Sequence, residues 1–383
     1  MKGIHSIFRE EPGLSAKILY LRQSGEMRLT GSASEIDLPP SVKRISLQAP
    51  PFDGALTAPL KVYFSLTREC ELSCPMCFSR HQHDNRTVLT IKVVDRILEE
   101  LAEMGVLEVR FTGGEPTLFP GFSDLVAQAD GRGVNVSINT HGVYSAQKRN
   151  QLAAGAVREF NISLDGPAHI HDAIRGDGVF DQTVKTIRTL REASKKVRIN
   201  TMLFRNNISY LKEILALAES LGVGIRFCPM RSIGGKSARE FAQAAAPTQS
   251  QWAEAKEQIQ QMADYASVPV LYHSNDELEN WADCLGSTVC LEQAKCAAWL
   301  TQLGIDSEGY VYAGGCIDDH PKSLSVGSVL EFSMKDLWVR VLRDTSGRLM
   351  RQYPRCAECQ PATLWSVWIN HFDRRWAKSY HLF

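Results

Sequence analysis

The sequence lacks net charge, long apolar runs and low-complexity tracts. Its 383 residues carry 43 Lys and Arg against 43 Asp and Glu, so no surplus of positive charge favours a nucleic-acid backbone or an anionic membrane surface. No window offers the ~18 uninterrupted apolar residues that a membrane-spanning helix needs, and no apolar signal segment follows Met1. We therefore expect a globular, cytoplasmic protein whose partners are neither nucleic acid nor membrane.

Cysteine is the residue type whose placement is informative. The chain has ten cysteines, and in a reducing cytosol grouped cysteines indicate metal or catalytic sites rather than disulfides. Only Cys228 stands away from both groups. One group is a tight triplet and the other lies beyond residue 280: Cys70, Cys74 and Cys77, then Cys284, Cys290, Cys296, Cys316, Cys356 and Cys359. This grouping predicts two separate metal sites.

Strand-like and helix-like segments alternate through the middle of the chain. The predicted strands are 61–67, 107–112, 134–140, 158–165, 197–204 and 223–229. Six βα units in series imply a parallel sheet with right-handed crossovers. Six are fewer than the eight of a closed barrel, so we predict an α/β fold, a partial (β/α)6 barrel that stays open, with its site at the C-terminal ends of the strands.

The segments between these strands have the apolar periodicity of helices. Apolar residues keep the helical period from Ile91 to Met104, Asp181 is the expected N-cap of the helix that holds Val184 to Leu190, and Ser209 opens a further helix. His169 and His171 are expected on a loop. We divide the chain into a strand-rich extension, the partial barrel, a bridge with a helix from Thr248 to about Tyr265, and a small cysteine-rich α+β domain: 1–57, 58–235, 236–289 and 290–383.

The cysteine triplet C-x3-C-x2-C directly follows the first barrel strand. Three thiolates are one short of the four that saturate a 4Fe–4S cluster, so one iron stays open to another ligand. Here the sequence resembles the radical S-adenosylmethionine (SAM) superfamily, which implies that SAM chelates the open iron. Met76 replaces the aromatic residue that is usual before the last cysteine. The alternative is a zinc site, with His81 or His83 as the fourth ligand.

Two further segments carry the same resemblance. Thr112-Gly113-Gly114-Glu115-Pro116 ends the second strand and is similar to the family's GGEP motif, which implies that Gly113, Gly114 and Glu115 hold the methionyl amine of SAM. Glycines at this place also let backbone groups approach a ligand closely.

The second segment ends the fourth strand, with Asn161-Ile162-Ser163-Leu164-Asp165-Gly166 and then His171-Asp172-Ala173-Ile174-Arg175-Gly176. It resembles the SPASM/twitch branch, which implies SAM contacts for Ser163, Asp165 and Arg175. Asn139 and Thr140, at the end of the third strand, are further candidates for the SAM or substrate pocket. The alternative is that Asp172 and Arg175 form a surface capping pair.

The C-terminal cysteines resemble the shortened twitch domain. Cys296, then a hairpin with Gly309, then Cys316 begin the pattern, and Cys356 and Cys359 end it. The resemblance implies that Cys296, Cys316, Cys356 and Cys359 bind one auxiliary 4Fe–4S cluster. Cys290 competes with Cys296 as the first ligand, and a zinc ribbon on the same four residues remains the alternative.

The resemblance implies a radical SAM enzyme that cleaves SAM reductively and removes a hydrogen atom from a substrate. An external one-electron donor such as flavodoxin or ferredoxin would supply the electron. The expected substrate is a natural-product precursor peptide, with oxidative modification by cross-linking or dehydrogenation. Two alternatives stay open: a sugar or aminocyclitol dehydrogenase or epimerase, and a non-enzymatic iron–sulfur electron carrier.

The end of the sixth strand supplies the candidates on the substrate side. Arg226, Cys228, Met230 and Arg231 lie there, and we assign catalytic roles to Cys228 and Arg231. Cys228 is a possible hydrogen-atom donor in an epimerisation, although isolated strand cysteines are more often small buried hydrophobes. Because a second cluster is a suitable electron acceptor, we expect oxidation of the substrate.

Overall fold

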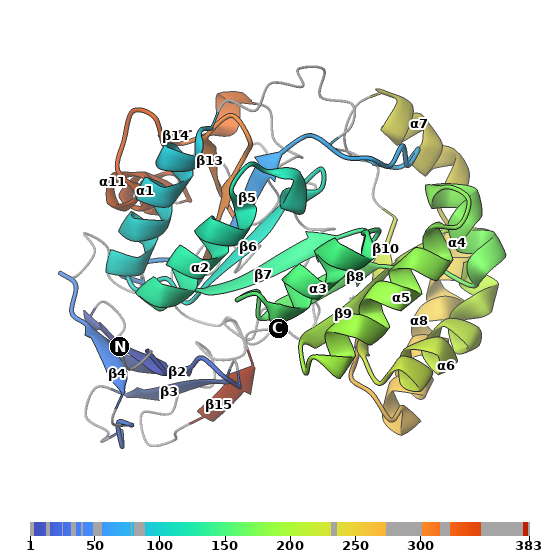
Figure 1. The fold of residues 1–383 in the computed structure, drawn as a ribbon, viewed down its shortest axis with the longest axis horizontal. Helices are drawn as coiled ribbons and strands as arrows, with labels where there is room; N and C mark the ends of the chain where they lie inside the picture. The colour runs from blue at the N-terminus through green and yellow to red at the C-terminus, as the bar shows by residue number, and fades with distance from the viewer. Residues whose placement is uncertain are drawn as a thin grey trace.

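The computed structural model describes residues 4–12, 16–24, 26–31, 36–39, 41–48, 56–77, 79, 89–230, 236–272, 301–314, 322–345 and 378–381. Two sheets organise this part of the chain (Figure 1). A ten-stranded sheet forms the centre, and a five-stranded sheet lies at its lower left in the view of Figure 1. None of the described helices has the length and apolar character that crossing a membrane requires.

The central sheet has the strand order β11-β10-β9-β8-β7-β6-β5-β12-β13-β14, and the strands from β12 to β11 run parallel. Its strands are β5 (Lys61–Thr67), β6 (Glu108–Gly113), β7 (Asn135–Thr140), β8 (Glu159–Ser163), β9 (Lys196–Leu203), β10 (Gly224–Pro229), β11 (Val270–Tyr272), β12 (Gln302–Ile305), β13 (Tyr310–Ala313) and β14 (Gly327–Ser328). The six strands β5 to β10 confirm the six sequence predictions and the α/β class with a central parallel sheet. In the described residues the outermost strands β11 and β14 do not pair with each other, so the sheet does not close.

Both edges of the sheet differ from the sequence expectation. β11 lies in the region assigned to a bridge, yet it pairs in parallel with β10. β12 comes from the region assigned to the C-terminal domain, and it pairs in parallel with β5. The βα alternation therefore runs beyond the six predicted units in one direction, and a distant hairpin extends the sheet in the other.

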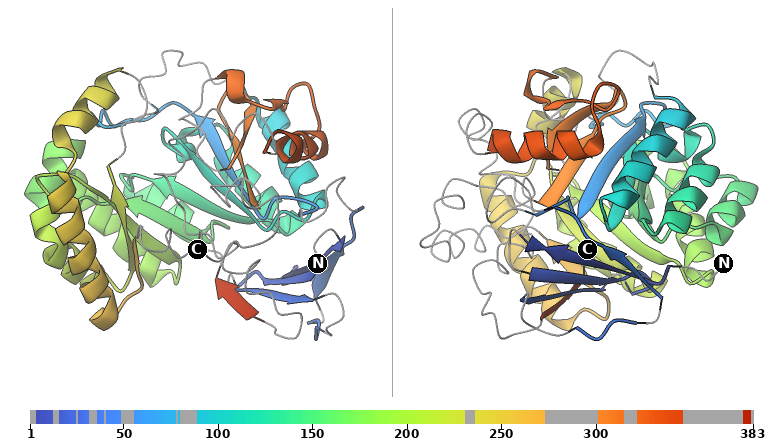
Figure 2. Two further views of the ribbon diagram at one scale, coloured as in Figure 1. Left: turned by 180° about the vertical axis from the view of Figure 1, so that it is seen from behind. Right: turned by 90° about the vertical axis from the view of Figure 1, so that its left-hand side faces the viewer.

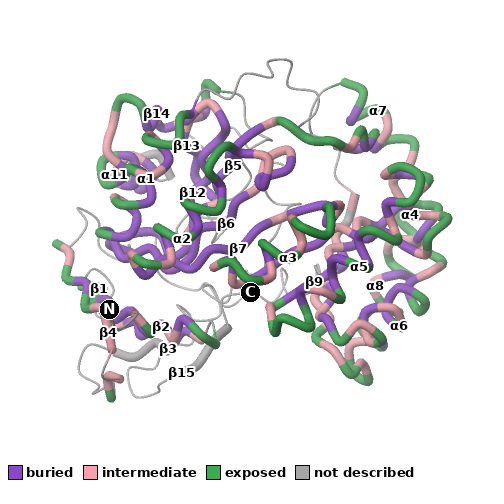
Figure 3. The backbone as a smooth tube through the Cα atoms, viewed as in Figure 1, coloured by how far each residue is buried: buried purple, intermediate pink, exposed green. Residues whose placement is uncertain are grey.

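Helices pack against the outer face of this sheet, as the two views of Figure 2 show. They are α1 (Ile91–Glu103), α2 (Phe122–Arg132), α3 (Ala146–Ala154), α4 (Ala168–Arg175), α5 (Val179–Glu192), α6 (Leu211–Leu221), α7 (Lys236–Ala245), α8 (Gln249–Tyr265) and α11 (Met334–Thr345). Between them, Phe64, Phe111 and Ile138 of the sheet are fully buried with Ile97 and Leu125 of the helices. Figure 3 shows this buried layer along the central strands. Burial of such side chains stabilises each by about 1.5–3 kcal/mol.

Local signals explain most helix ends. Thr90 caps α1 through Val93 N, and Thr248 and Gln251 form a capping box at α8, so the predicted helices at Ile91 and after Thr248 are confirmed. The predicted N-cap at Asp181 is wrong. The N-cap lies three residues earlier, at Gly178, which adopts φ 74°, a left-handed conformation that glycine adopts without strain.

The smaller sheet combines the N-terminal residues with the last described strand. Its order is β15-β3-β2-β1-β4, with β1 (Ser6–Glu11), β2 (Ala16–Leu21), β3 (Glu26–Gly31), β4 (Val42–Ile45) and β15 (Lys378–His381). It is held to the central domain by buried guanidinium groups. Arg9 Nη1 donates to Gly105 O at 2.9 Å, and Arg22 Nε donates to Asn135 Oδ1 at 3.0 Å. These bonds satisfy charges that burial would otherwise penalise.

Candidate functional site

The cysteine triplet lies on the loop that leaves the C-terminal end of β5. Cys70 is exposed, Cys77 is half-buried and Cys74 is buried. Cys74 packs with Met76, Ile174 and Phe204, which come from its own loop, from α4 and from the end of β9. Burial raises the pKa of the Cys74 thiol, while the nearby Arg175 guanidinium opposes this. The thiol at the centre of the loop is therefore held in a fixed, water-poor place next to a cation.

The Gly-Gly-Glu turn at the end of β6 packs directly on this loop. Gly114 N donates to Thr67 O and Glu115 N donates to Glu69 O, each at 2.7 Å. A Cβ on Gly113 would lie 2.2 Å from Thr67 O, and one on Gly114 would lie 2.1 Å from Glu69 O. Gly113 also has φ +121°. Both glycines are therefore required by the close approach of two backbones immediately before Cys70.

Glu115 is the centre of a buried hydrogen-bond network. It is fully buried; Oε1 accepts from Thr117 N, Thr117 Oγ1 and Tyr144 OH at 2.9–3.2 Å. Oε2 accepts from Thr140 Oγ1 at 2.7 Å and from His141 N at 3.3 Å. Each carboxylate oxygen already has several protein donors, so Glu115 ties the ends of β6 and β7 together. The predicted contact of Glu115 with the amine of SAM stays a prediction.

His141 joins the cysteine loop to this network. Its Nε2 lies 3.1 Å from Glu71 Oε2 and 3.2 Å from Glu115 Oε2. Burial lowers the pKa of His141, but hydrogen bonds with Cys70 and Glu71 and the Glu115 charge outweigh burial and raise it to about 10. The ligand atoms of Cys70, Glu71 and His141 lie within 4.8 Å of one another, so this trio could also hold a metal ion. Sequence reasoning missed Glu71 and His141.

Asp165 and Arg175 form a buried ion pair beside the cysteine loop. Arg175 Nε lies 2.6 Å from Asp165 Oδ2, and Asp165 Oδ1 accepts from Met202 N at 2.9 Å. The charges of Asp165, Cys74 and Cys77 raise the pKa of Arg175 against its burial. Asp172 accepts instead from Gly178 N and Phe180 N. The alternative of an Asp172–Arg175 surface pair is therefore wrong.

His171 supports this ion pair from α4. The expectation of a loop for His169 and His171 is wrong, since both lie on this helix. His171 is buried, and its Nδ1 accepts from Asp165 N at 3.0 Å. Burial lowers the pKa of His171 to about 4, so it is neutral near pH 7.

A row of polar side chains crosses the inner face of the sheet, opposite the helices. Asn139 is in register with Asn161, and Ser163 is in register with Asn200. The Oδ1 atoms of Asn139, Asn161 and Asn200 are buried without a hydrogen-bond partner. Buried polar atoms are rarely left unsatisfied, so this face has the character of a ligand-binding surface. It adjoins the cysteine loop at the ends of the same strands.

The structure describes only some of the remaining predicted residues. Cys228 is half-buried on β10, two residues beyond Arg226 and therefore on the same face of the sheet. Several other predicted residues lie outside the described part of the chain: Arg231, His81, His83, Cys290, Cys296, Cys316, Cys356 and Cys359.

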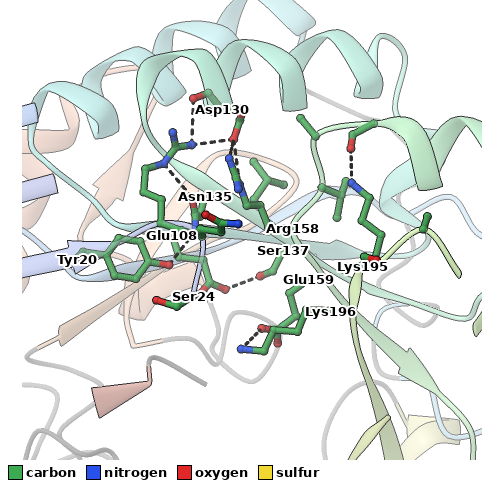
Figure 4. Close-up of a pocket in the computed structure, with 18 residues that line it drawn as sticks. Tyr20, Ser24, Glu108, Asp130, Asn135, Ser137, Arg158, Glu159, Lys195 and Lys196 are labelled. Atoms are coloured by element: carbon green, nitrogen blue, oxygen red, sulfur yellow. Dashed lines mark hydrogen bonds and ion pairs between the residues drawn. The ribbon is translucent and has the colours of Figure 1, made fainter. Parts of the chain in front are cut away.

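A cavity of about 420 Å³ lies at the opposite, N-terminal edge of the strands (Figure 4). Its charged side chains include Arg22, Arg158 and Lys195, which bind a carboxylate or a backbone carbonyl of the protein. Arg22 and Arg158 both lie 2.8 Å from Asp130 Oδ1, and Lys195 donates to Gly155 O. This cavity is a polar seam between the two sheets, and it lies away from the cysteine loop.

Residues 64–218 match the family model described as "Radical SAM superfamily". This chain carries a radical SAM domain. The chain is similar to mycofactocin maturase MftC of Mycobacterium tuberculosis (strain CDC 1551 / Oshkosh), with 35% identity over 186 residues, 48% of this chain and 48% of the maturase. It is similar to PqqA peptide cyclase of Streptomyces rochei, with 31% identity over 225 residues, 58% of this chain and 62% of the cyclase. The chain thus spans about half the length of the curated relatives it matches.

The fold is similar to that of Streptococcus suis SuiB bound to precursor peptide SuiA. The TM-score is 0.61 over 78% of this chain and 67% of SuiB, with 17% identity. At this identity the likeness concerns the fold alone. Together the comparisons confirm the radical SAM domain that the cysteine spacing and the Gly-Gly-Glu turn predicted.

Proposed function

We propose that this protein is a radical SAM enzyme that modifies a peptide oxidatively. The observation that carries the proposal is the cysteine loop within the matched domain. It bears three thiols, it is clamped by the Gly-Gly-Glu turn, and it faces the Arg175 guanidinium. A non-enzymatic electron carrier has no need of such a clamp or of an adjoining unsatisfied polar face.

The described residues fit the group that the family implies. Cys70, Cys74 and Cys77 would ligate three irons of a 4Fe–4S cluster, and their thiols are close enough to influence one another's charge. The methionyl end of SAM would lie against the Gly113–Gly114 backbone, with its carboxylate near Arg175. The ribose hydroxyls would find Ser163 and the unsatisfied Oδ1 of Asn139.

A cluster held by Cys70, Cys74 and Cys77 together with SAM would supply radical chemistry, the abstraction of an unactivated hydrogen atom from the substrate. The chain's own residues would position the cofactors and shield the reaction from water. Asp165 fixes the guanidinium of Arg175, and Glu115 fixes the ends of β6 and β7 around the cysteine loop. Phe204, Met76 and Ile174 exclude water from the Cys74 side. A radical needs such exclusion because water and stray groups quench it.

An auxiliary cluster on Cys296, Cys316, Cys356 and Cys359 belongs to the same proposal, with Cys290 as the competing first ligand. Its support is the hairpin between the first two cysteines. β12 and β13 form that hairpin, with Gly309 at φ +87° in its turn, as the sequence pattern predicts. Because β12 pairs with β5, the hairpin lies beside the strand that leads to Cys70. Such a cluster would accept the electron that oxidation of the substrate releases.

The substrate class rests on the relatives. One relative's name describes a peptide cyclase, and the similar fold was solved with a precursor peptide. We therefore propose a natural-product precursor peptide as substrate and a flavodoxin or ferredoxin as electron donor.

The test uses the full chain, reconstituted anaerobically with iron and sulfide and supplied with SAM and a reductant. Short peptides encoded beside the gene are the candidates, and mass spectrometry reads the product. We expect about eight irons per chain and a product lighter by two hydrogens. Replacement of Cys356 and Cys359 by Ala should abolish the product while SAM cleavage continues. An unchanged product with zinc in place of the second set of irons would overturn the auxiliary cluster.

A further inference from the structure

Two arginines lie on adjacent parallel strands of the inner face. Arg198 of β9 is opposite Gly224, and Arg226 of β10 is opposite Asn200, so the two arginines are diagonal neighbours one pleat apart. Burial and the charges of Arg226 and Arg110 together lower the pKa of Arg198 to about 10, against the opposing charge of Glu159. The two guanidinium groups therefore repel each other in a water-poor region.

Among the described residues, the ion pairs of the inner face involve more cations than carboxylates. Glu108 pairs with Lys61 at 2.7 Å and Arg110 at 3.1 Å, while Glu159 pairs with Arg110, Arg198 and Lys196 at 3.2–3.5 Å. Two carboxylates thus serve four cations before Arg226 is counted. The same surplus lowers the pKa of Tyr63: its burial acts in the other direction, but Lys61, Arg110 and Arg226 outweigh it. A negative charge added here would be stabilised.

Arg226 is the cation of this face that pairs with neither Glu108 nor Glu159. Across the described part of the chain, it has neither an ion pair nor a hydrogen bond. It is half-buried, whereas its strand neighbours Ile225 and Phe227 are fully buried on the helix side. A half-buried guanidinium without a partner is costly unless an anion reaches it.

Asn200, beside Arg226, indicates the kind of anion. Its Oδ1 is buried without a donor. A peptide that carries a carboxylate provides a partner for both Arg226 and Asn200. The carboxylate accepts from the Arg226 guanidinium, and a neighbouring peptide N–H donates to Asn200 Oδ1. A fully deprotonated inorganic anion such as sulfate or chloride has no donor for this amide oxygen.

We propose that Arg226, with Arg198 and Asn200 beside it, binds a carboxylate of the substrate peptide on the inner face of the sheet. This inference rests on the proposed function, because the bound peptide is a substrate only if the protein is a peptide-modifying enzyme. It adds which chemical group of that peptide the protein recognises. The carboxylate comes either from an acidic side chain or from the C-terminus of the peptide.

The test measures binding of three acetylated pentapeptides to the reconstituted full chain with SAM, by isothermal titration calorimetry. One peptide has a central glutamate and an amidated end, one is pentaglycine with a free carboxylate, and one is pentaglycine amide. We expect one of the two acidic peptides to bind at least tenfold more tightly than the neutral amide, and which one does so identifies the source of the carboxylate.

Variants of Arg226 test the contact itself. Arg226→Gln should bind the tighter acidic peptide about ten- to hundred-fold more weakly than the wild type does, a loss typical of a hydrogen bond to a charged group. Arg226→Lys should recover part of it. The exposed Arg188 serves as control, and Arg188→Gln should bind as the wild type does.

A second readout locates the contact. Phenylglyoxal modifies accessible arginines, and mass spectrometry of chymotryptic peptides reports Arg226 separately; we expect the tighter acidic peptide to protect it. Equal binding of all three peptides, or protection of Arg226 by SAM alone with no further effect of peptide, would overturn the inference. Cleavage of SAM by the wild type is measured in parallel. Intact SAM cleavage without carboxylate preference refutes this inference alone, whereas absent SAM cleavage with carboxylate preference refutes the proposed function alone.

Discussion

Replacement of Gly114 by Ala tests whether the Gly-Gly-Glu turn clamps the cysteine loop. A Cβ on Gly114 would lie 2.1 Å from Glu69 O, whereas ordinary contacts begin at 3.4 Å, so the two backbones must separate by about 1.3 Å. Overpacking of this kind costs about 1–3 kcal/mol. The separation also weakens the bonds from Gly114 N and Glu115 N, each of which contributes about 0.5–1.5 kcal/mol. We therefore expect the free energy of unfolding to fall by about 2–6 kcal/mol.

Gly131→Ala is the matched control. Gly131 lies in α2, and nothing stands within 4 Å of the added Cβ, so alanine should stabilise the helix by about 0.5–1 kcal/mol. Anaerobic urea denaturation measures both variants, and iron analysis after reconstitution measures the loop. Gly114→Ala should retain less iron than Gly131→Ala because Glu69 directly precedes Cys70. If both variants matched the wild type in stability and iron content, the clamp would be refuted.

Three further changes test other parts of the site. Asp165→Asn leaves Arg175 buried without its counter-charge and should lower the free energy of unfolding by about 3–5 kcal/mol in urea, so a loss under about 1 kcal/mol would contradict the ion pair. His171 has a pKa of about 4 in the fold against 6.5 as its ordinary value, so the unfolded chain binds the proton first and stability falls as pH drops from 6.5 to 4, by about 3 kcal/mol. His171→Asn, which retains an acceptor for Asp165 N, should lose less stability over that interval, and parallel pH curves for the two proteins would show that His171 does not contribute. For Cys228, turnover in deuterium oxide should give a product lighter by two hydrogens in both wild type and Cys228→Ala; one deuterium gained by the wild type and lost by the variant would indicate epimerisation instead.

Local patterns predicted the features that depend on local geometry. The spacing of Cys70, Cys74 and Cys77 is short enough to place three thiols on one loop, and alternation such as Ile225-Arg226-Phe227 follows directly from a strand with one apolar face. The glycines of the turn also signalled close backbone approach. The approach is to the backbone of the cysteine loop, which only the pairing of β5 with β6 reveals.

Features that depend on contacts between distant residues were missed. His141 lies 70 residues from Glu71 in the chain and meets it only because β7 ends beside the cysteine loop. β11 is three residues long, too short for a periodic signal, and is recognisable as a strand only through its pairing with β10. The sequence predicts β12 as one strand of a hairpin, but nothing in it specifies that β12 also pairs with β5.

The most direct measurement is SAM cleavage by the reconstituted chain, with 5'-deoxyadenosine detected by mass spectrometry. The comparison is between the wild type, Cys228→Ala and a variant in which Cys70, Cys74 and Cys77 are all replaced by Ala. The account predicts 5'-deoxyadenosine from the wild type and from Cys228→Ala, and none from the triple variant, which should also lose about half of its iron. Formation of 5'-deoxyadenosine by the triple variant, or none by an iron-loaded wild type, would contradict the assignment of the cysteine loop.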